Sequence, residues 1–292
     1  MTATARARPT TRVRVTEVTR QRPGGATRED RLAGEEPLEI RLAWPGHEAA
    51  RVAVTMRTPG HDFELAAGFL HGEGVLGAGQ LHTVAYCTSD DLTPDERFNV
   101  VTVTLRDRPA TPPAPRYAGP GGASSACGVC GVESITDVLA RCRPSGGTPA
   151  DSIAPDQVVP ADVVHRLPET LRDRQRIFDS TGGLHGAGLF DADGTPVVVR
   201  EDIGRHNAVD KVIGARLLAG APTALPVLCV SGRIGFEIVQ KAVAAGVGVL
   251  VAVGAPSSLA VALAERAGLC AIGFVRADRY VVYSHPHRIG VV

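Results

Sequence analysis

The stretch PVLCVSGRIGFEIVQKAVAAGVGVLVAVG, residues 226–254, decides the fold class of this chain. Two short apolar runs in it, PVLCVS and VLVAVG, flank a segment of helical period, GFEIVQKAVAAG. A strand, a helix and a second strand in this order predict a right-handed crossover between parallel strands. The same alternation continues on both sides, with strands expected at 187–190, 196–202, 270–275 and 279–284 and helices at 206–219 and 257–268.

This alternation predicts an α/β lobe over residues 132–292, built as a mostly parallel sheet with helices on both faces. Two further helices are expected before the first strand, VESITDVLAR (132–141) and PADVVHRLPETLRDRQRIF (160–178), bridging to the rest of the chain. Proline lacks the amide donor that a helix interior requires, so Pro168 is expected to break or kink the second helix.

Residues 31–108 follow a different pattern, which predicts a smaller α+β lobe. The alternating runs PLEIRLAW and ARVAVTMR form a candidate hairpin, and FNVVTVTLR (98–106) alternates as a third strand. Thr58 and Pro59 are suited to the cap and first turn of a helix that follows the hairpin. Residues 1–30 are rich in Thr, Arg and Pro without a sustained apolar period, so a mostly disordered arm is expected there.

Composition excludes several classes of protein. The chain has 292 residues, 44% of them hydrophobic, and a formal net charge of zero, which disfavours bulk binding to nucleic acid. The start of the chain has no apolar segment of a secretory signal, and the most apolar run, residues 242–255, is too short to span a membrane. Six cysteines are too few for a disulfide framework, so we expect a soluble cytoplasmic protein.

Cys127 and Cys130 form a C-x-x-C pair inside GGASSACGVCG, residues 121–131. Prolines precede the pair and glycines and serines surround it, which predicts a flexible loop over residues 109–131. No strand precedes the pair, as it would in a thioredoxin-like redox site, and structural zinc would need four ligands. Sulfur carriage needs a reactive, accessible thiolate and a second thiol, so redox, zinc and sulfur transfer all remain open.

Several polar segments follow the predicted strands, where open α/β sheets bind their ligands. Paired glycines precede His185, and helix starts of the kind that bind phosphate contain Arg233 and Ser257 or Ser258. Each has a structural alternative, as a turn histidine, a solvated helix start or a cap. The segment REDIGRHNAVDK adds further candidates at one strand–helix boundary: Arg200, Glu201, Asp202, Arg205, His206, Asp210 and Lys211.

Zinc deaminase chemistry is disfavoured, because Ala187 stands where an H-x-E motif would have its glutamate and no later P-C-x-x-C follows. In the segment FVRADR, Phe274 offers a ring face to a purine. Arg276 and Arg279 could bind a pyrophosphate as a pair of guanidinium groups, or belong to an ordinary basic turn.

Taken together in chain order, these motifs resemble the FdhD/NarQ family of formate dehydrogenase accessory proteins. The resemblance runs from about residue 35 to the end, and it is carried by TPGHDFELAAGFLHGEGV, CGVCG, TGGLHGAGLF, REDIGRHNAVDKVIG, SGRIGFEIVQKA, GAPSSLAVALAERAGL and HPHRI. It implies a three-layer, cytidine-deaminase-like larger lobe and a homodimer.

The resemblance also implies a function as a sulfur carrier, that is, a sulfurtransferase acting through a cysteine persulfide. Cys127 would accept sulfur from a cysteine desulfurase, with Cys130 as its partner. The recipient would be the molybdenum of bis-molybdopterin guanine dinucleotide, before this cofactor enters formate dehydrogenase. The cofactor would bind the residues Phe274, Val275, Arg276, Ala277, Asp278 and Arg279, and no structural metal is expected. A cofactor-binding chaperone and a zinc or redox C-x-x-C protein remain the alternatives.

Overall fold

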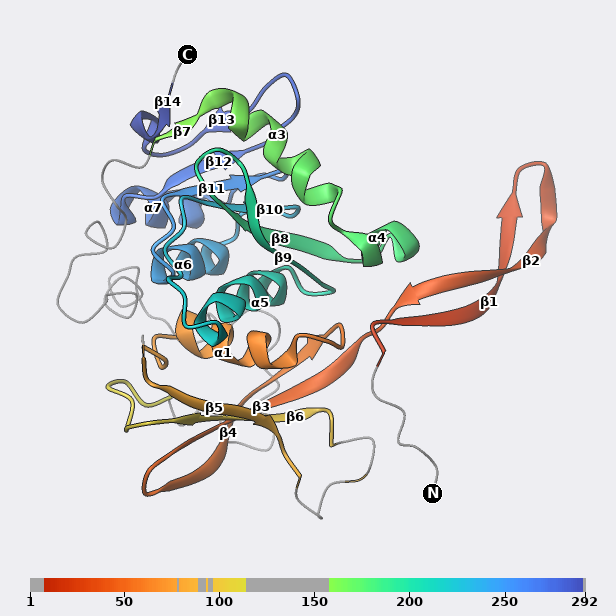
Figure 1. Cartoon of the computed structure of the whole chain (residues 1–292). Coiled ribbons are helices and arrows are strands. Elements are labelled where there is room, and N and C mark those ends of the chain that lie inside the picture. The colour runs from red at the N-terminus through yellow and green to blue at the C-terminus, as the bar shows by residue number, and fades with distance from the viewer. Residues whose placement is uncertain (1–7, 78, 89–92, 94–96, 114–157, 291–292) are drawn as a thin grey trace.

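A computed structural model describes residues 8–77, 79–88, 93, 97–113 and 158–290. Within these ranges the chain forms two packed lobes and a projecting hairpin (Figure 1). Residues 114–131 of the expected loop, with Cys127 and Cys130, lie outside the described residues, as do the expected helix at 132–141 and Cys142. None of the described helices has the length and apolar character needed to cross a membrane.

The smaller lobe is a four-stranded sheet covered on one face by a helix. Its strand order is β4-β3-β6-β5. The expected hairpin is confirmed as an antiparallel pair of β3 and β4, and the expected strand at 98–106 is confirmed as β6, whereas β5 was not predicted. The bounds are β3 Glu36–Trp44, β4 His47–Arg57, β5 Leu81–Tyr86 and β6 Val100–Leu105.

The helix of this lobe, α1 (Asp62–Gly72), begins four residues after the expected cap at Thr58. His61 occupies the cap position in the left-handed region, with a φ of 60°. The Thr58 hydroxyl instead accepts a hydrogen bond from the amide of Ile203 in the other lobe, at 3.1 Å. Thr58 therefore connects the two lobes and does not cap α1.

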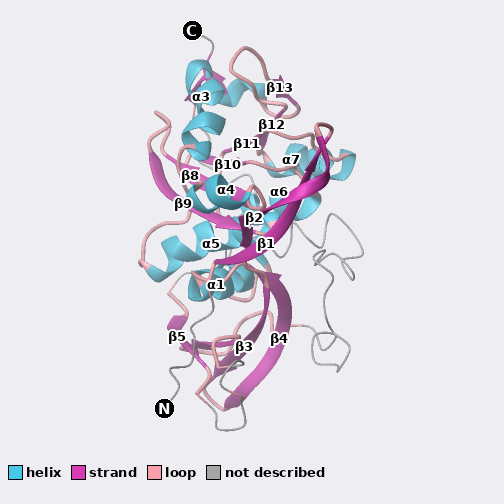
Figure 2. Cartoon of the chain, turned by 90° about the vertical axis from the view of Figure 1, so that its right-hand side faces the viewer, coloured by secondary structure: helices cyan, strands magenta, loops and turns pink. Residues whose placement is uncertain are grey.

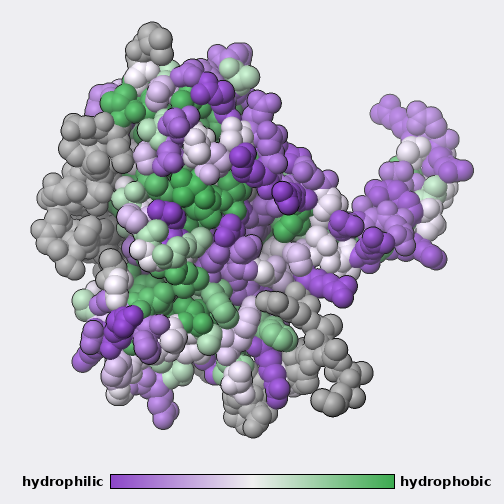
Figure 3. All heavy atoms as spheres, in the orientation of Figure 1, coloured by the Kyte–Doolittle hydropathy of each residue, from purple (hydrophilic) through white to green (hydrophobic). Residues whose placement is uncertain are grey.

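The expectation of a disordered N-terminal arm is wrong for the part of the arm that the structure describes. Strands β1 (Thr10–Thr19) and β2 (Arg22–Ala33) pair antiparallel and project from the body of the molecule (Figures 1 and 2). Hydrophilic side chains cover most of the hairpin (Figure 3). The sequence has no apolar alternation here because neither face of the hairpin lies on a core.

The larger lobe contains a six-stranded sheet of order β13-β12-β11-β10-β8-β9. Only β10, β11 and β12 are mutually parallel; the other neighbours are antiparallel, so the prediction of a mostly parallel sheet is wrong. The short DADG turn between β8 and β9 leaves no room for a crossover helix, which forces an antiparallel pair. The bounds are β8 His185–Phe190, β9 Pro196–Asp202, β10 Val227–Val230, β11 Val249–Ala252, β12 Cys270–Gly273 and β13 Val281–Val282.

Helices cover both faces of this sheet, as expected. On one face α5 (Arg205–Leu218), α6 (Phe236–Ala244) and α7 (Ser258–Ala267) bury apolar side chains against alternate strand residues. On the other face lies α3 (Ala161–Arg172), which runs through Pro168 without a break, and α4 (Arg176–Thr181) follows it. Two short strands, β7 (Val159–Pro160) and β14 (Ile289–Gly290), pair beside the η3 turn (Pro286–Arg288).

The two lobes meet through α1 and α5, which lie between their sheets (Figure 1). The contact is close enough for backbone to meet backbone. A Cβ atom added to Gly68 would lie 1.9 Å from the Asp210 carbonyl oxygen. A Cβ atom added to Gly214 would lie 1.8 Å from the Glu64 carbonyl oxygen. Glycine is therefore required at both positions.

Candidate functional site

The candidate site lies where the three parallel strands end. Val230 of β10 pairs with Ala252 of β11, and Val251 pairs with Ile272 of β12, so these strands finish at one edge. The start of β8 and the end of β9 reach the same edge because β8 runs antiparallel to both β10 and β9. We call this edge the rim; it comprises His185 and the segments 202–205, 231–233, 253–258 and 273–279.

The loops of the rim contact one another through their backbones. The Gly254 amide donates to the Gly232 carbonyl at 3.1 Å, and the Phe274 amide donates to the Gly254 carbonyl at 3.2 Å. A Cβ atom at Gly254 would lie 2.8 Å from the Gly232 carbonyl oxygen. The rim is therefore a fixed set of loops whose spacing depends on glycine.

Phe274 is strained and exposed. Its φ of 54° lies in the left-handed region, which is unfavourable for a side chain with a Cβ atom, and 43% of the residue is accessible to solvent. Strain of this kind at an exposed aromatic residue is typical of binding sites. Its neighbour Val275 behaves differently, because it is 1% exposed and packs in the core beneath α3.

The remaining residues of the expected cofactor stretch form a tight turn. The Arg276 amide donates to the Arg279 carbonyl at 2.8 Å. The Arg276 guanidinium donates to the carbonyls of Val253, at 2.9 Å, and Val275, at 2.8 Å. These bonds hold Arg276 against the end of β11. Arg276, Ala277, Asp278 and Arg279 are all exposed.

Three cationic or titratable side chains meet at the other end of the rim, and we call His185, Arg205 and Arg233 the cationic cluster. A Cβ atom at Gly232 would lie 3.5 Å from the His185 Nδ1 atom and 3.7 Å from Arg205. Burial lowers the pKa of His185, and the charges of Arg205 and Arg233 lower it further. The Arg205 Nε atom is buried without a hydrogen-bond partner among the described residues. The two arginines give this part of the rim the positive charge that attracts an anion.

Ser257, a weaker candidate for ligand binding, has a structural role. Its hydroxyl accepts a hydrogen bond from the Ala260 amide at 3.2 Å and so caps α7. Ser258, the first residue of this helix, is exposed on the rim.

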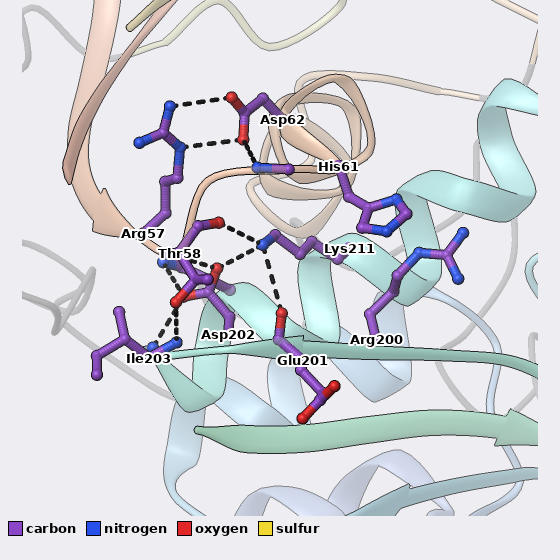
Figure 4. Close-up of polar contacts among 12 residues, drawn as sticks. Arg57, Thr58, His61, Asp62, Arg200, Glu201, Asp202, Ile203 and Lys211 are labelled. Carbon is purple, nitrogen blue, oxygen red and sulfur yellow. Dashed lines mark hydrogen bonds and ion pairs between the residues drawn. The ribbon is translucent and has the colours of Figure 1, made fainter. Parts of the chain in front are cut away.

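Part of the REDIGRHNAVDK segment holds the lobes together: Figure 4 shows Asp202, Ile203 and Lys211 around Thr58 of the smaller lobe. The Lys211 ammonium lies 2.6 Å from a carboxylate oxygen of Asp202 and donates to the Thr58 carbonyl at 2.9 Å. The same Asp202 carboxylate accepts from the Thr58 amide at 3.1 Å. Lys211 and Asp202 are fully buried, so they are structural.

Other charged residues of this segment also pair across or within the lobes. Arg200 of β9 donates through two nitrogen atoms to the Glu64 carboxylate of α1, at 2.6 and 2.7 Å.

Burial raises the pKa of Asp210 to about 6, although the Lys241 ammonium lies 2.7 Å away. The Glu201 carboxylate accepts from the amides of Ile177 and Phe178 in α4, at 2.9 and 2.8 Å. His206 pairs with Glu237 at 2.7 Å. Of this segment, Arg205 is the residue with an unused donor at the rim.

The described cysteines are unsuited to nucleophilic chemistry at the rim. Cys229 and Cys270 are buried in strands, and burial raises the pKa of both thiols, that of Cys270 to about 12. Cys87 lies in the smaller lobe, 3.8 Å from an Arg41 nitrogen. Within the described ranges no three His, Cys, Asp or Glu side chains gather as metal ligands.

A cavity of about 720 Å³ opens beside the cationic cluster and was not predicted from the sequence. We call it the α3–α4 cavity, because these two helices form one wall and the rim residues His185, Ser231 and Val253 form the other. Its remaining lining residues are Pro168, Glu169, Leu171, Arg172, Gln175, Phe178, Gly182, Gly183 and Leu184.

Comparisons with known proteins show the family of this chain. The family model described as the FdhD/NarQ family matches residues 33–290. A protein of Nocardia farcinica named "Sulfur carrier protein FdhD" is 48% identical over 285 residues, covering 97% of this chain and 95% of the relative. A protein of the same name from Mycolicibacterium paratuberculosis is 46% identical over 286 residues, covering 96% and 99%.

Among solved structures, a crystal structure from Desulfotalea psychrophila matches with a TM-score of 0.69 and 24% identity, covering 96% of this chain and 99% of that one. This likeness supports the fold. The family model and the two relatives cover almost the whole chain, so the chain belongs to the FdhD/NarQ family.

Proposed function

We propose that this chain is a sulfur carrier that forms a persulfide on Cys127 and passes the sulfur to the molybdenum of bis-molybdopterin guanine dinucleotide. The recipient enzyme of the loaded cofactor would be formate dehydrogenase, and a cysteine desulfurase would be the donor. The observation that carries the proposal is that the cationic cluster and the exposed, strained Phe274 lie on one rim, on a chain whose relatives are named sulfur carriers.

The rim fits the substrate assigned to it. A guanine dinucleotide is anionic through its phosphates and presents flat purine faces. The charges of Arg205 and Arg233 suit the phosphates, and the exposed ring of Phe274 suits a base. In the described part of the chain, neither arginine forms an ion pair with an acidic side chain, so both charges are available to a ligand.

The transfer can be written as two thiol exchange steps. The Cys127 thiolate attacks the outer sulfur of the donor's persulfide; the donor S–S bond breaks, and its electron pair leaves with the donor thiolate. The Cys130 thiolate then attacks the inner sulfur on Cys127. A Cys127–Cys130 disulfide forms and the outer sulfur leaves as hydrosulfide, which the metal accepts. The two thiols supply the two electrons, and a cellular thiol reductant restores them.

The proposal places both thiols on the loop of residues 109–131, so that one sulfur atom can reach the donor and then the rim. The structure describes the first residues of that loop, up to residue 113, and resumes at residue 158, next to β7. A cytidine-deaminase-like arrangement of the larger lobe, a homodimer and a cytoplasmic location complete the proposal.

The deciding experiment restores formate dehydrogenase activity in cells that lack their own sulfur carrier. Cys127→Ala is expected to abolish the restored activity, while the protein keeps its thermal unfolding midpoint. Cys87→Ala is the matched control, because this thiol lies in the smaller lobe, and it should leave activity unchanged. Full activity with Cys127→Ala would favour the alternative, a chaperone that binds the cofactor without transferring sulfur.

A further inference from the structure

The β1–β2 hairpin, which we call the projecting hairpin (Thr10–Ala33), is a two-stranded sheet of its own that stands away from the body (Figures 1 and 2). Most of its residues are exposed, and these include the apolar Val18, at 64%, and Leu32, at 47%. Two strands with no core of their own are only marginally stable in water. A covering surface from outside the described chain would stabilise this hairpin.

The projecting hairpin has an excess of positive charge. Its charged residues are six arginines and three acids: Arg12, Arg14, Arg20, Arg22, Arg28, Arg31, Glu17, Glu29 and Asp30. Its net charge is therefore +3, in a chain whose formal net charge is zero. An excess of one sign on a projecting element attracts a surface of the opposite sign and favours encounter with it.

The acidic side chains of the projecting hairpin do not cancel this excess. Arg28 lies 3.3 Å from Glu17 and 3.1 Å from Asp30. Arg12 lies 3.8 Å from Glu29. Each acidic side chain thus already has an arginine beside it, and the excess charge belongs to the remaining arginines.

The remaining arginines lack counter-charges of their own. Arg12 of β1 is paired directly opposite Arg31 of β2, and like charges in this position destabilise a hairpin. Arg14, Arg20 and Arg22 are exposed and form no ion pair with any residue that the structure describes. Arg20 and Arg22 belong to the turn at the far end of the hairpin. A carboxylate-rich surface would relieve the repulsion and pair with the free guanidinium groups.

A protein surface fits the projecting hairpin better than nucleic acid does. The hairpin has no Phe, Tyr or Trp to stack on a base, and its acidic side chains would repel phosphates. A second copy of this chain is less suitable as the partner. Asp162 and Asp179, which are exposed on α3 and α4, already pair with Arg166 and Arg172 of the same chain. The charge pattern therefore favours an acidic patch on a different protein.

The base of the projecting hairpin lies beside the α3–α4 cavity. A Cβ atom at Gly183, which lines this cavity, would lie 3.6 Å from the Cβ atom of Ala33 at the end of β2. Strand β2 also contacts α4. The cavity in turn reaches the rim, because His185 belongs to both. A protein held by the hairpin would therefore lie next to the rim.

We propose that the projecting hairpin docks on an acidic surface patch of the protein that takes up the ligand of the rim. Arg14, Arg20 and Arg22 supply the charge for this contact. The proposal rests on the proposed function for the identity of the partner, which is then formate dehydrogenase. The cysteine desulfurase delivers its sulfur to Cys127 and does not need the hairpin.

Binding of the full-length protein to formate dehydrogenase without its cofactor tests the proposal, and biolayer interferometry measures it. Reversing two charges, Arg20→Glu with Arg22→Glu, is expected to weaken binding about tenfold and to make the affinity less dependent on salt. Arg20→Lys with Arg22→Lys keeps the charge and should retain binding. The matched control is Arg106→Glu with Arg108→Glu, the same change in charge at exposed residues after β6, and it should bind like the wild type.

The desulfurase provides a second control, because its binding and the persulfide that it forms on Cys127 should stay the same in every variant. If the reversed variant has a lower thermal unfolding midpoint, Arg20→Gln with Arg22→Gln gives the same test. Unchanged affinity for the dehydrogenase in a folded variant, or an equal loss in the Arg106 and Arg108 control, would overturn the proposal.

The other outcomes also decide. A variant that loses self-association in sedimentation but keeps its affinity for the dehydrogenase would assign the projecting hairpin to a second copy and overturn the proposal. A wild type that does not bind the dehydrogenase would refute the proposed recipient and this proposal together. A wild type that binds through the hairpin but forms no persulfide on Cys127 would support this proposal and refute sulfur transfer.

Discussion

The Cβ position of Gly68 lies 1.9 Å from the carbonyl oxygen of Asp210, so α1 and α5 touch backbone to backbone. This contact sets the distance between the lobes. Gly68→Ala is expected to lower the free energy of unfolding by about 3 kcal/mol, because the carbonyl of a buried helix cannot move aside. Urea denaturation measures this, with Gly24→Ala of the hairpin as the control, since a Cβ atom there meets nothing within 4 Å. Equal stability of the two variants would contradict the close contact.

Lys211 neutralises Asp202 at the interface of the lobes. Lys211→Met leaves this fully buried carboxylate without its cation, so we expect a loss of about 3 kcal/mol of unfolding free energy. Adding Asp202→Asn should recover part of the loss, because no buried charge is then left unpaired. Additive losses in the double variant would show that the two groups are not coupled.

The ion pair between Arg200 and Glu64 predicts how stability depends on pH. Although burial opposes it, the hydrogen bonds from Arg200 and His61 lower the pKa of Glu64 to about 2. A lowered folded pKa stabilises the protein above the ordinary value of 4.5, and this contribution is lost as the pH falls toward 2.

Glu64→Gln should therefore destabilise the protein by about 2 kcal/mol at pH 7, and the difference from the wild type should shrink steadily below pH 4.5. Denaturant titrations at pH 7, 5, 4 and 3 measure it. A difference that stays constant down to pH 3 would show that the ionised carboxylate is not the stabilising group.

Phe274 predicts opposite effects on stability and on binding. Glycine accepts a positive φ without strain, so Phe274→Gly should raise the free energy of unfolding by about 1 kcal/mol. The same change removes the exposed ring and should weaken GDP about tenfold, whereas Phe274→Tyr should keep the affinity. Calorimetry and thermal unfolding of the three proteins test both expectations. Unaltered GDP affinity in Phe274→Gly would exclude stacking on this ring.

The strand–helix alternation of the second half could be predicted because buried strands and amphipathic helices leave different periods in the sequence. The rim followed from the same pattern, since polar segments after parallel strands must meet at one edge. Arg233 and Phe274 were expected after strands and lie at this edge, whereas the place of His185 at the start of β8 was not predicted. The ligands that these rim residues would bind remain predictions.

Other features left no such signal. The hairpin from Thr10 to Ala33 has two polar faces, so its period is hidden. Whether Asp202 and Lys211 point to the rim or to the other lobe depends on packing against Thr58, which is 144 residues away from Asp202 in the chain. The α3–α4 cavity was missed because its lining joins α3 and α4 to rim residues far along the chain, which no local pattern records.

The central claim is that sulfur travels on Cys127. Mass spectrometry of the protein after incubation with a cysteine desulfurase and cysteine measures this directly. The Cys130→Ala variant is included because it lacks the thiol of the second step, so the persulfide on Cys127 should accumulate. The account predicts one added sulfur atom on the peptide that contains Cys127, and none on the peptides that contain Cys229 or Cys270. Sulfur on another cysteine, or on none while the desulfurase is active, would contradict it.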